Sequence, residues 1–284
     1  MPLTVRSLLT EAVTCLQQAG RRNPRADAEV LLADTLQRPR SWLLAHSDTA
    51  LSPERAEKFR ELVQQRTTGR PLQYVRGRQE FFGRSFFVDE RVLIPRPETE
   101  VLVETVLSLN LQTPSPIVAD VGTGSGCIGV TLACERPNWR VIATDVSMSA
   151  LRVARRNSLH LGVGARVELV CANLLEPFEG LRYFDAIVSN PPYVTAGDPL
   201  IDPEVALFEP ATALYAGTVG TEIHEALLRT AHACLKSQGF LVLEMGFGQS
   251  ERLLSLAQQL GWQPQTVAAD LAGIPRCMVL TRTL

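Results

Sequence analysis

The feature that most constrains this chain is an alternation of short apolar runs and amphipathic segments from residue 117 onward. Apolar runs rich in Val, Ile and Leu predict buried strands, at residues 117–121, 140–145, 166–170, 184–190 and 239–245. Segments with helical periodicity lie between or after them, at residues 127–135, 147–161, 222–236 and 249–260. This alternation predicts an α/β fold with a doubly wound, mostly parallel sheet that binds ligands at the carboxyl ends of its strands. Residues 262–270 and 276–281 lack a helix between them and predict an antiparallel edge hairpin.

The region before residue 98 has a different pattern. Residues 3–68 read as helices throughout, with Pro24 at a helix start, Ser52 as an N-cap and Gly20 and Gly69 as stops. Aromatic and β-branched residues then alternate up to two prolines that end the extended run. The sequence therefore predicts three parts: a helical bundle at 1–72, a β-hairpin connector at 73–97 and an α/β domain at 98–284.

Charge is distributed unevenly along the chain. The net charge of −2 argues against a general nucleic-acid binder. Residues 1–97 carry 16 Lys and Arg against 11 Asp and Glu, a net +5, so the remainder, with 12 against 19, carries −7. A basic region can meet an acidic partner, although an ordinary solvated surface has the same composition. The sequence has no apolar run of membrane-spanning length and does not begin like a signal peptide, so we expect a cytoplasmic protein.

Cysteine and histidine give no sign of a metal site. The six cysteines are scattered singly through apolar stretches and predict reduced, mostly buried thiols. The four histidines lack metal-ligand spacing, so we expect surface or capping roles: His46, His160, His224 and His232. We expect no metal cofactor.

A glycine-rich loop follows the first predicted strand, in ADVGTGSGC at residues 119–127. Glycines let the chain turn sharply and let a ligand approach the backbone at a helix N-terminus. Gly124, Gly126 and Gly129 fit the pattern G-x-G-x-x-G, and Asp145 ends the next predicted strand. A carboxylate there can accept the ribose hydroxyls of either NAD or S-adenosylmethionine, so this loop alone leaves both cofactors open.

The fourth predicted strand separates the two cofactors, because it ends in Asn190-Pro191-Pro192-Tyr193. A planar nitrogen is a poor nucleophile, since its lone pair is delocalised, and a site that methylates it must orient its N–H bonds. The side-chain carbonyl of Asn190 and the main-chain carbonyl of Pro191 are two such acceptors, and the prolines fix the backbone. Tyr193 offers a flat face for a planar group. Orientation of this kind can contribute about 7–11 kcal/mol without a strong base.

Taken together, these motifs resemble the HemK/PrmC-type N5-glutamine methyltransferases, which modify peptide-chain release factors. The resemblance runs from about residue 69 to the C-terminus and includes GRPLQY (69–74), EFFG (80–83), VLIPRPETE (92–100), DVGTGSGCIG (120–129), TDVSMSAL (144–151), SNPPYV (189–194), FEP (208–210) and LEMG (243–246). It implies a Rossmann-like class I methyltransferase fold with a seven-stranded sheet and a cytoplasmic, monomeric enzyme. Arg96, Glu98 and Glu100 match too, and we expect them to pack the connector against the catalytic domain.

The resemblance also implies roles for individual residues. The cofactor, S-adenosylmethionine, becomes S-adenosylhomocysteine and is held by Gly122, Thr123, Gly124, Ser125, Gly126, Asp145, Asn173, Leu174 and Asn190. Catalysis and glutamine binding fall to Asn190, Pro191, Pro192 and Tyr193. Asn173 stands where relatives have an Asp; it can still accept from adenine, and Leu174 can pack on the ring.

The implied partners are class 1 release factors, with the glutamine of their Gly-Gly-Gln motif as the methylated residue and residues 1–72 as the docking region. Three alternatives stay open. A ribosomal protein is a second glutamine substrate, a DNA adenine-N6 methyltransferase shares the Asn-Pro-Pro-Tyr motif, and a binding module could retain the fold without activity. A DNA methyltransferase would require a basic target-recognition region and a pocket for a flipped base. The catalytic region instead carries a net −7 and has no inserted recognition domain, so we expect no direct nucleic-acid substrate. The acidic stretch 198–209 predicts either a lid or recognition loop or a plain solvated loop.

Overall fold

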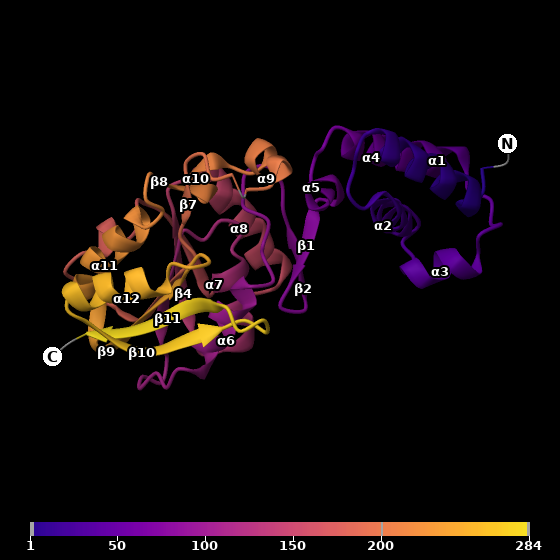
Figure 1. Cartoon of the computed structure of the whole chain (residues 1–284). Coiled ribbons are helices and arrows are strands. Elements are labelled where there is room, and N and C mark those ends of the chain that lie inside the picture. The colour runs from indigo at the N-terminus through magenta and orange to yellow at the C-terminus, as the bar shows by residue number, and fades with distance from the viewer. Residues whose placement is uncertain (1–2, 200, 283–284) are drawn as a thin grey trace. The chain divides into compact units, whose positions relative to one another are not determined.

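The computed structural model describes residues 3–199 and 201–282. The chain forms two compact units, Met1–Arg78 with Asp202–Phe208 and Gln79–Ile201 with Glu209–Leu284. We call them the helical unit and the sheet unit, and describe each by itself (Figure 1). None of the helices in the described part of the chain is both long and apolar enough to cross a bilayer.

The helical unit packs short helices around one apolar core. Its helices are α1 (Val5–Gln18), α2 (Pro24–Leu36), α3 (Arg40–Ala45), α4 (Pro53–Thr67), α5 (Leu72–Arg76) and α9 (Pro203–Phe208). Thr4 and Ser7 form a capping box at the start of α1, and Ser52 caps α4 through the backbone N–H of Arg55. Fully buried leucines from α1 and α2 pack with Phe59 of α4 in the centre.

Helix α9 joins this unit from a distant part of the sequence. Glu204 in α9 forms ion pairs with Arg21 (2.6 Å) and Arg66 (3.0 Å), and Asp202 pairs with Arg22 (2.6 Å). Arg66 is itself buried and also donates to Asp27 at 2.8 Å. Residues 203–208 therefore form a helix of this unit and not a plain solvated loop.

The sheet unit is built on seven strands: β3 (Ile117–Val121), β4 (Arg140–Asp145), β5 (Val167–Cys171), β6 (Phe184–Ser189), β9 (Leu235–Glu244), β10 (Trp262–Ala269) and β11 (Pro275–Arg282). Their order is β10-β11-β9-β6-β3-β4-β5. The strands from β9 to β5 are parallel, and β11 and β10 add antiparallel at one edge. The predicted doubly wound sheet with an antiparallel edge hairpin is confirmed.

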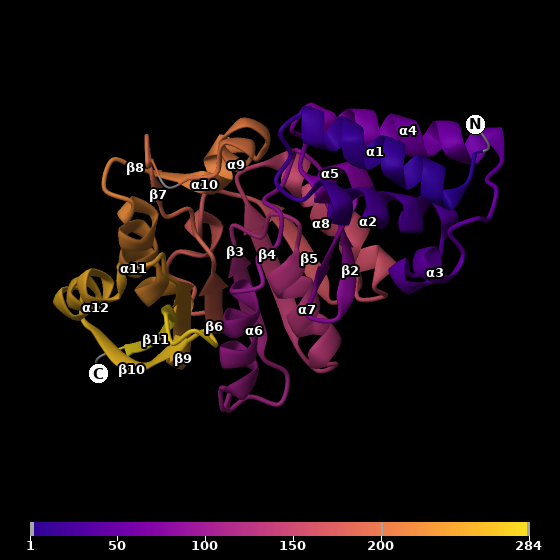
Figure 2. The same cartoon turned by 45° about the vertical axis from the view of Figure 1, so that its right-hand side comes forward.

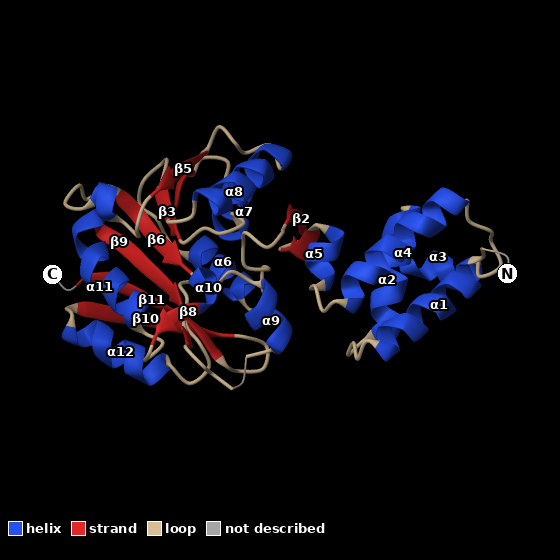
Figure 3. Ribbon diagram, turned by 90° about the horizontal axis from the view of Figure 1, so that it is seen from above, coloured by secondary structure: helices blue, strands red, loops and turns tan. Residues whose placement is uncertain are grey.

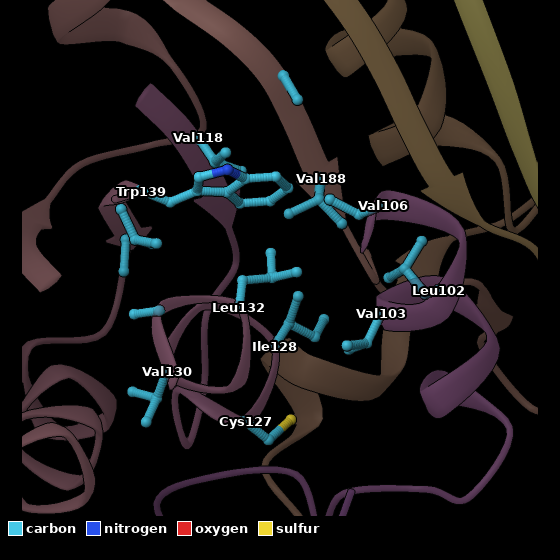
Figure 4. Close-up of a cluster of buried hydrophobic side chains, with 14 of the residues drawn as sticks. Leu102, Val103, Val106, Val118, Cys127, Ile128, Val130, Leu132, Trp139 and Val188 are labelled. Atoms are coloured by element: carbon cyan, nitrogen blue, oxygen red, sulfur yellow. The ribbon is translucent and has the colours of Figure 1, made fainter. Parts of the chain in front are cut away.

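Helices cover both faces of this sheet (Figure 3). Helices α6 (Thr99–Ser108), α7 (Cys127–Glu135) and α8 (Met148–His160) cover one face, and α11 (Glu222–Cys234) and α12 (Ser250–Gln259) cover the other. Successive strand residues point to opposite faces, so Val118 packs with the first group and Ala119 with the second. Figure 4 shows side chains of α6 and α7 meeting Val118 and Val188 of the sheet.

Shorter elements complete the unit. β1 (Arg78–Phe81) and β2 (Arg84–Phe87) form a two-stranded sheet whose turn residues, Phe82 and Gly83, both have positive φ, at 49° and 69°. This is the turn geometry that matches the twist of a hairpin. Several small elements were not predicted from the sequence: the 3-10 turn at Glu176–Phe178, α10 (Ala211–Leu214) and the parallel pair β7 (Val194–Thr195) with β8 (Tyr215–Gly217).

Two expectations about single residues are wrong. His224 is fully buried rather than at the surface, and its Nε2 lies 2.7 Å from the backbone oxygen of Glu244. It occupies an apolar face of α11, where the helical pattern alone would have placed it inside. Of the six free cysteines only Cys127, Cys234 and Cys277 are buried, while Cys15 and Cys171 are exposed.

Candidate active site

The site lies where the order of strands in the sheet reverses. After β3 the chain adds β4 and β5 on one side, then returns to place β6 on the other side of β3 (Figure 2). Loops at the carboxyl ends of neighbouring strands β3 and β6 therefore leave in different directions and open a crevice. Ser189 at the end of β6 donates its hydroxyl to the backbone oxygen of Val121 at 2.7 Å, which ties the two strand ends together.

A cavity of about 820 Å³, part of it open to solvent, occupies this crevice. The loops after β3, β4, β5 and β6 contribute to its wall, together with residues 91–93 of the connector and the segment around α10. The lining residues include Leu93, Gly122, Gly124, Asp145, Val146, Ala150, Asn173, Leu174, Asn190, Pro192, Pro210 and Thr212.

The glycine loop presents bare backbone to this cavity. Gly122 and Gly124 have φ of 71° and 55°, and a Cβ added to either would meet no atom within 4 Å. Gly126 is different, because its φ is 82° and an added Cβ would lie 3.2 Å from the Cβ of Ala154 in α8. The first two glycines keep the cavity open, and the third allows α7 and α8 to pack closely.

Asp145 is held with its carboxylate in the cavity wall. Its Oδ2 accepts from the backbone N–H of Gly124 at 2.9 Å, and its Oδ1 accepts from that of Ser147 at 2.8 Å. Burial raises the pKa of this carboxyl, and the two backbone donors oppose the rise. Each oxygen retains acceptor capacity, so the group can take two ligand hydroxyls at once.

A second carboxyl, Asp120, lies fully buried behind the same loop. Its Oδ2 accepts from the hydroxyl of Thr123 and from the backbone N–H of Gly129, at 2.9 Å, whereas its Oδ1 has no partner among the described residues. Burial raises its pKa to about 6. Asp120 was not predicted as a site residue, although an acidic residue inside an apolar strand could have indicated it.

Leu174 and Asn173 form the wall that follows β5. Leu174 has a φ of 50°, a left-handed conformation that costs a non-glycine residue free energy. Asn173 donates its Nδ2 to Glu176 at 2.6 Å, so its Oδ1 remains available as an acceptor. Both residues line the cavity, as the sequence analysis expected of residues that hold a ligand.

The Asn-Pro-Pro-Tyr segment is fixed at both ends by side chains from other elements. Asn190 donates its Nδ2 to the hydroxyl of Thr99 at 3.1 Å. The backbone oxygen of Tyr193 accepts from Nε2 of Gln249 at 3.1 Å, and the same amide donates to Gly220 and accepts from the N–H of Gly246. Burial raises the pKa of Tyr193 to about 12, so its hydroxyl stays protonated at neutral pH.

Not all of the predicted site residues reach the cavity. Those that line it are Gly122, Gly124, Asp145, Asn173, Leu174, Asn190 and Pro192. The others are not among its lining residues. The hydroxyl of Thr123 donates to Asp120, and the backbone oxygen of Ser125 accepts from Asn157 at 2.8 Å. Gly126, Pro191 and Tyr193 complete this second group.

Glu209 precedes Pro210, which lines the cavity, and fixes this segment to the connector. Its side chain is fully buried; Oε1 accepts from Arg96 at 2.7 Å and Oε2 accepts from the backbone N–H of Ile94 at 3.0 Å. Glu100 similarly accepts from the backbone N–H of Phe82 at 2.7 Å. These contacts hold the connector on the sheet unit, which is the role expected for Arg96 and Glu100.

Comparisons with known proteins agree with this geometry. The PrmC N-terminal domain family matches residues 7–77, and the methyltransferase small domain family matches residues 97–217. The solved methyltransferase from Pyrococcus furiosus shares the fold, with a TM-score of 0.53 at 19% identity over 72% of this chain and 91% of that one.

Curated relatives match over nearly the whole chain. The release factor glutamine methyltransferase of Moorella thermoacetica is 43% identical over 99% of both chains. That of Koribacter versatilis is 38% identical over 98% of both. The family expected from the motifs is confirmed: this chain belongs to the release factor glutamine methyltransferases.

Proposed function

We propose that this protein transfers a methyl group from S-adenosylmethionine to the side-chain nitrogen, N5, of the glutamine in the Gly-Gly-Gln motif of class 1 release factors. The observation that carries the chemistry is the fixed amide of Asn190, placed at the strand-order reversal beside the glycine loop and Asp145. The names of the full-length relatives supply the substrate class.

The cavity fits S-adenosylmethionine in three respects. Open space next to Gly122 and Gly124 leaves room for the methionine part against bare backbone. Asp145 offers two oxygens for the ribose hydroxyls, and Leu174 an apolar surface for adenine. The unpartnered Oδ1 of Asp120 gives the buried end of the loop a negative group that can compensate an ammonium.

When bound, S-adenosylmethionine supplies an electrophilic methyl: the new N–C bond forms as the C–S bond breaks, the electron pair goes to sulfur to give S-adenosylhomocysteine, and the nitrogen releases one proton to water. The chain's own residues make the weak nucleophile competent by orientation. Asn190 Oδ1 and the carbonyl of Pro191 each accept one N–H of the glutamine amide. The ring of Tyr193 supports the amide plane. No strong general base is required, because approach and alignment supply most of the acceleration.

We further propose that residues 1–72 dock the release factor and that the enzyme acts as a cytoplasmic monomer. The excess of Lys and Arg before residue 98 supports the docking role, because it suits an acidic partner surface. The cytoplasmic location follows from the proposed substrate, which acts in translation.

Intact-mass analysis of purified class 1 release factors after incubation with enzyme and S-adenosylmethionine tests this function. We expect one added methyl group, which fragmentation locates on the glutamine of Gly-Gly-Gln, and none when the enzyme carries Asn190→Ala. Cofactor binding without methylation of any release factor would refute the substrate assignment. Ribosomal proteins, incubated in the same way, would then be the next substrates to test.

A further inference from the structure

Gln249 is a half-buried amide side chain for which the proposed chemistry gives no role. It occupies the N-cap position of α12, where short side chains such as Ser, Thr, Asp and Asn are preferred because they accept from the first N–H groups of a helix. The side chain of Gln249 makes no such bond to its own helix. Helix capping therefore does not account for an amide at this position.

The amide of Gln249 bonds instead to the backbone of three loops. Its Nε2 donates to the backbone oxygen of Tyr193 and to that of Gly220, each at 3.1 Å, and its Oε1 accepts from the N–H of Gly246 at 2.9 Å. Tyr193 follows β6, Gly220 precedes α11 and Gly246 follows β9. Both N–H groups and the carbonyl oxygen of one side chain are thus used to tie these three loops together.

Two glycines let the loops meet at Tyr193. A Cβ added to Gly220 would lie 2.8 Å from the backbone oxygen of Tyr193, and one added to Gly246 would lie 2.9 Å from Cδ2 of its ring. Both distances are too short for a side chain. The backbone of both loops therefore lies directly against Tyr193, and the hydrogen bonds of Gln249 span this contact.

We propose that Gln249 is a positioning residue that fixes the Tyr193 end of the Asn-Pro-Pro-Tyr segment for methyl transfer. The inference rests on the proposed role of this segment in orienting the glutamine amide of the substrate. Gln249 touches neither of the groups proposed to accept from that amide, and acts through the backbone carbonyl of Tyr193.

The segment is held at both of its ends. At the first end, Nδ2 of Asn190 donates to the hydroxyl of Thr99 at 3.1 Å. The two prolines in the middle have no N–H to donate, and their rings restrict φ. With Gln249 at the second end, little rotation is left between the two ends. The carbonyl of Pro191 and the ring of Tyr193 then keep the direction that the substrate amide requires.

The chemistry of an amide suits this role better than its volume alone. A carboxylate in the same place would bring an oxygen to the carbonyls of Tyr193 and Gly220 and would repel both, although its shape is the same. An apolar chain of the same length would fill the space and would leave the three backbone groups without this partner. Substitution by Glu and by Met therefore separates an orienting role from space filling.

Gln249→Glu and Gln249→Met are tested in the full-length enzyme with a release factor as substrate. We expect kcat to fall about tenfold to a hundredfold in Gln249→Met, because a displacement of about 1 Å at a reacting group can cost a hundredfold. The loss should be larger in Gln249→Glu, because repulsion displaces Tyr193. The dissociation constant for S-adenosylmethionine should change by less than about twofold, since Gln249 is not a lining residue of the cavity. Normal kcat in Gln249→Glu would overturn the proposal.

Trp262→Phe is the control for a general loss of stability. Nε1 of the buried Trp262 donates to the backbone oxygen of Leu228 at 2.9 Å, so this change also removes a side-chain bond to backbone in the sheet unit, at a residue that does not line the cavity. We expect its melting temperature to fall while kcat stays within about twofold. If kcat fell as much as in Gln249→Met, stability alone would explain both losses and the positioning role would be refuted.

Gly246→Ala reaches the same segment by a second route. The backbone of Gly246 is not in the left-handed region, so the substitution tests the contact of the new Cβ with Tyr193 and Gln249 and not backbone strain. We expect kcat to fall in the same range. Combined with Gln249→Met, the loss should be smaller than the product of the two single losses, because both displace one segment. Losses that multiply would refute a shared action on Tyr193.

Hydrogen exchange followed by mass spectrometry gives a readout independent of turnover. Directly after Tyr193 the chain pairs with β8, and the backbone N–H of Ala196 donates to Gly217 at 3.1 Å. We expect peptides covering residues 193–197 and 218–221 to exchange faster in Gln249→Met than in the unmodified enzyme and in Trp262→Phe. Unchanged exchange would overturn the positioning role, whether or not the enzyme methylates release factors. Faster exchange in Gln249→Met, with no methyl transfer by the unmodified enzyme, would support the positioning of the segment and refute the proposed substrate alone.

Discussion

Buried charges in the helical unit and the carboxyls around the cavity of the sheet unit are compensated in different ways. In the helical unit buried charges meet charges of the opposite sign: Arg66 binds Asp27 and also pairs with Glu204, each at 3.0 Å or less. Around the cavity of the sheet unit, Asp120 and Asp145 accept instead from a hydroxyl and from backbone N–H groups, and burial raises the pKa of each.

The kind of partner distinguishes a carboxylate that stabilises the fold from one that can bind a ligand. A buried ion pair is compensated within the protein and has little left to offer a ligand. A carboxylate held by neutral donors keeps acceptor capacity and negative charge that a cationic or hydroxylated ligand can satisfy. The comparison implies that changes in the first unit alter stability, whereas changes at the cavity alter binding and catalysis.

The sharpest test on the catalytic side is Asn190→Ala. We expect methyl transfer to fall at least about a thousandfold, because this amide orients the nucleophile. Equilibrium titration should still detect S-adenosylmethionine, with reduced affinity, and the free energy of unfolding should change little. Normal turnover in this variant would refute the mechanism in which Asn190 accepts an N–H of the substrate amide.

On the structural side, Arg66→Met should lower the free energy of unfolding of the helical unit by about 3 kcal/mol, because it leaves Asp27 buried without its partner. Urea denaturation monitored at Trp42, the tryptophan of that unit, measures the effect. Arg60→Ala is the control, since its pair with Glu11 is exposed and worth at most about 1 kcal/mol. Equal effects of the two changes would remove the contrast between the units.

Asp145→Asn should weaken cofactor binding and leave the stability intact, the reverse of the effect expected for Arg66→Met. We expect the dissociation constant for S-adenosylmethionine to rise about tenfold to a hundredfold, equivalent to about 1.4–2.7 kcal/mol, through weaker acceptance of the ribose hydroxyls. The free energy of unfolding should stay the same or increase, because the raised pKa of Asp145 shows that its ionised form is disfavoured by burial. Calorimetric titration and thermal unfolding of the same samples give both quantities. A large loss of stability would make Asp145 a structural residue.

The smallest expected effect is a pH dependence of stability due to Glu244. Its pKa is raised from 4.5 to about 7 on folding, so between those values the folded state binds more protons than the unfolded state. Its contribution to stability is therefore present at low pH and is lost as pH rises through about 7. Glu244→Gln should flatten the unfolding free energy by about 1–2 kcal/mol across this range. His224 and Asp120 titrate in both proteins, so the difference between the two curves isolates Glu244; parallel curves would contradict the raised pKa.

Several features of this protein follow from local sequence. The strands and helices from residue 117 onward could be predicted because apolar periodicity reflects which face is buried. The glycine loop, Asp145 and Asn190 could be predicted as neighbours because parallel strands bring their carboxyl ends to one edge of the sheet. The antiparallel hairpin of β10 and β11 could also be predicted, because no helical segment separates its two apolar runs.

Other features arise only when distant segments meet. α9 belongs to the helical unit because Glu204 meets Arg21 and Arg66, and no pattern near residue 204 indicates partners so far away in the chain. The bond between Asn190 and Thr99, and the three contacts of Gln249, likewise join elements that only folding brings together. The sequence by itself determined the sheet, the family and the residues at its carboxyl edge, because these depend on periodicity and on short motifs. Only the tertiary structure decided which buried carboxyls are paired and which way the amide of Asn190 faces, because hydrogen-bond direction depends on partners brought together in space.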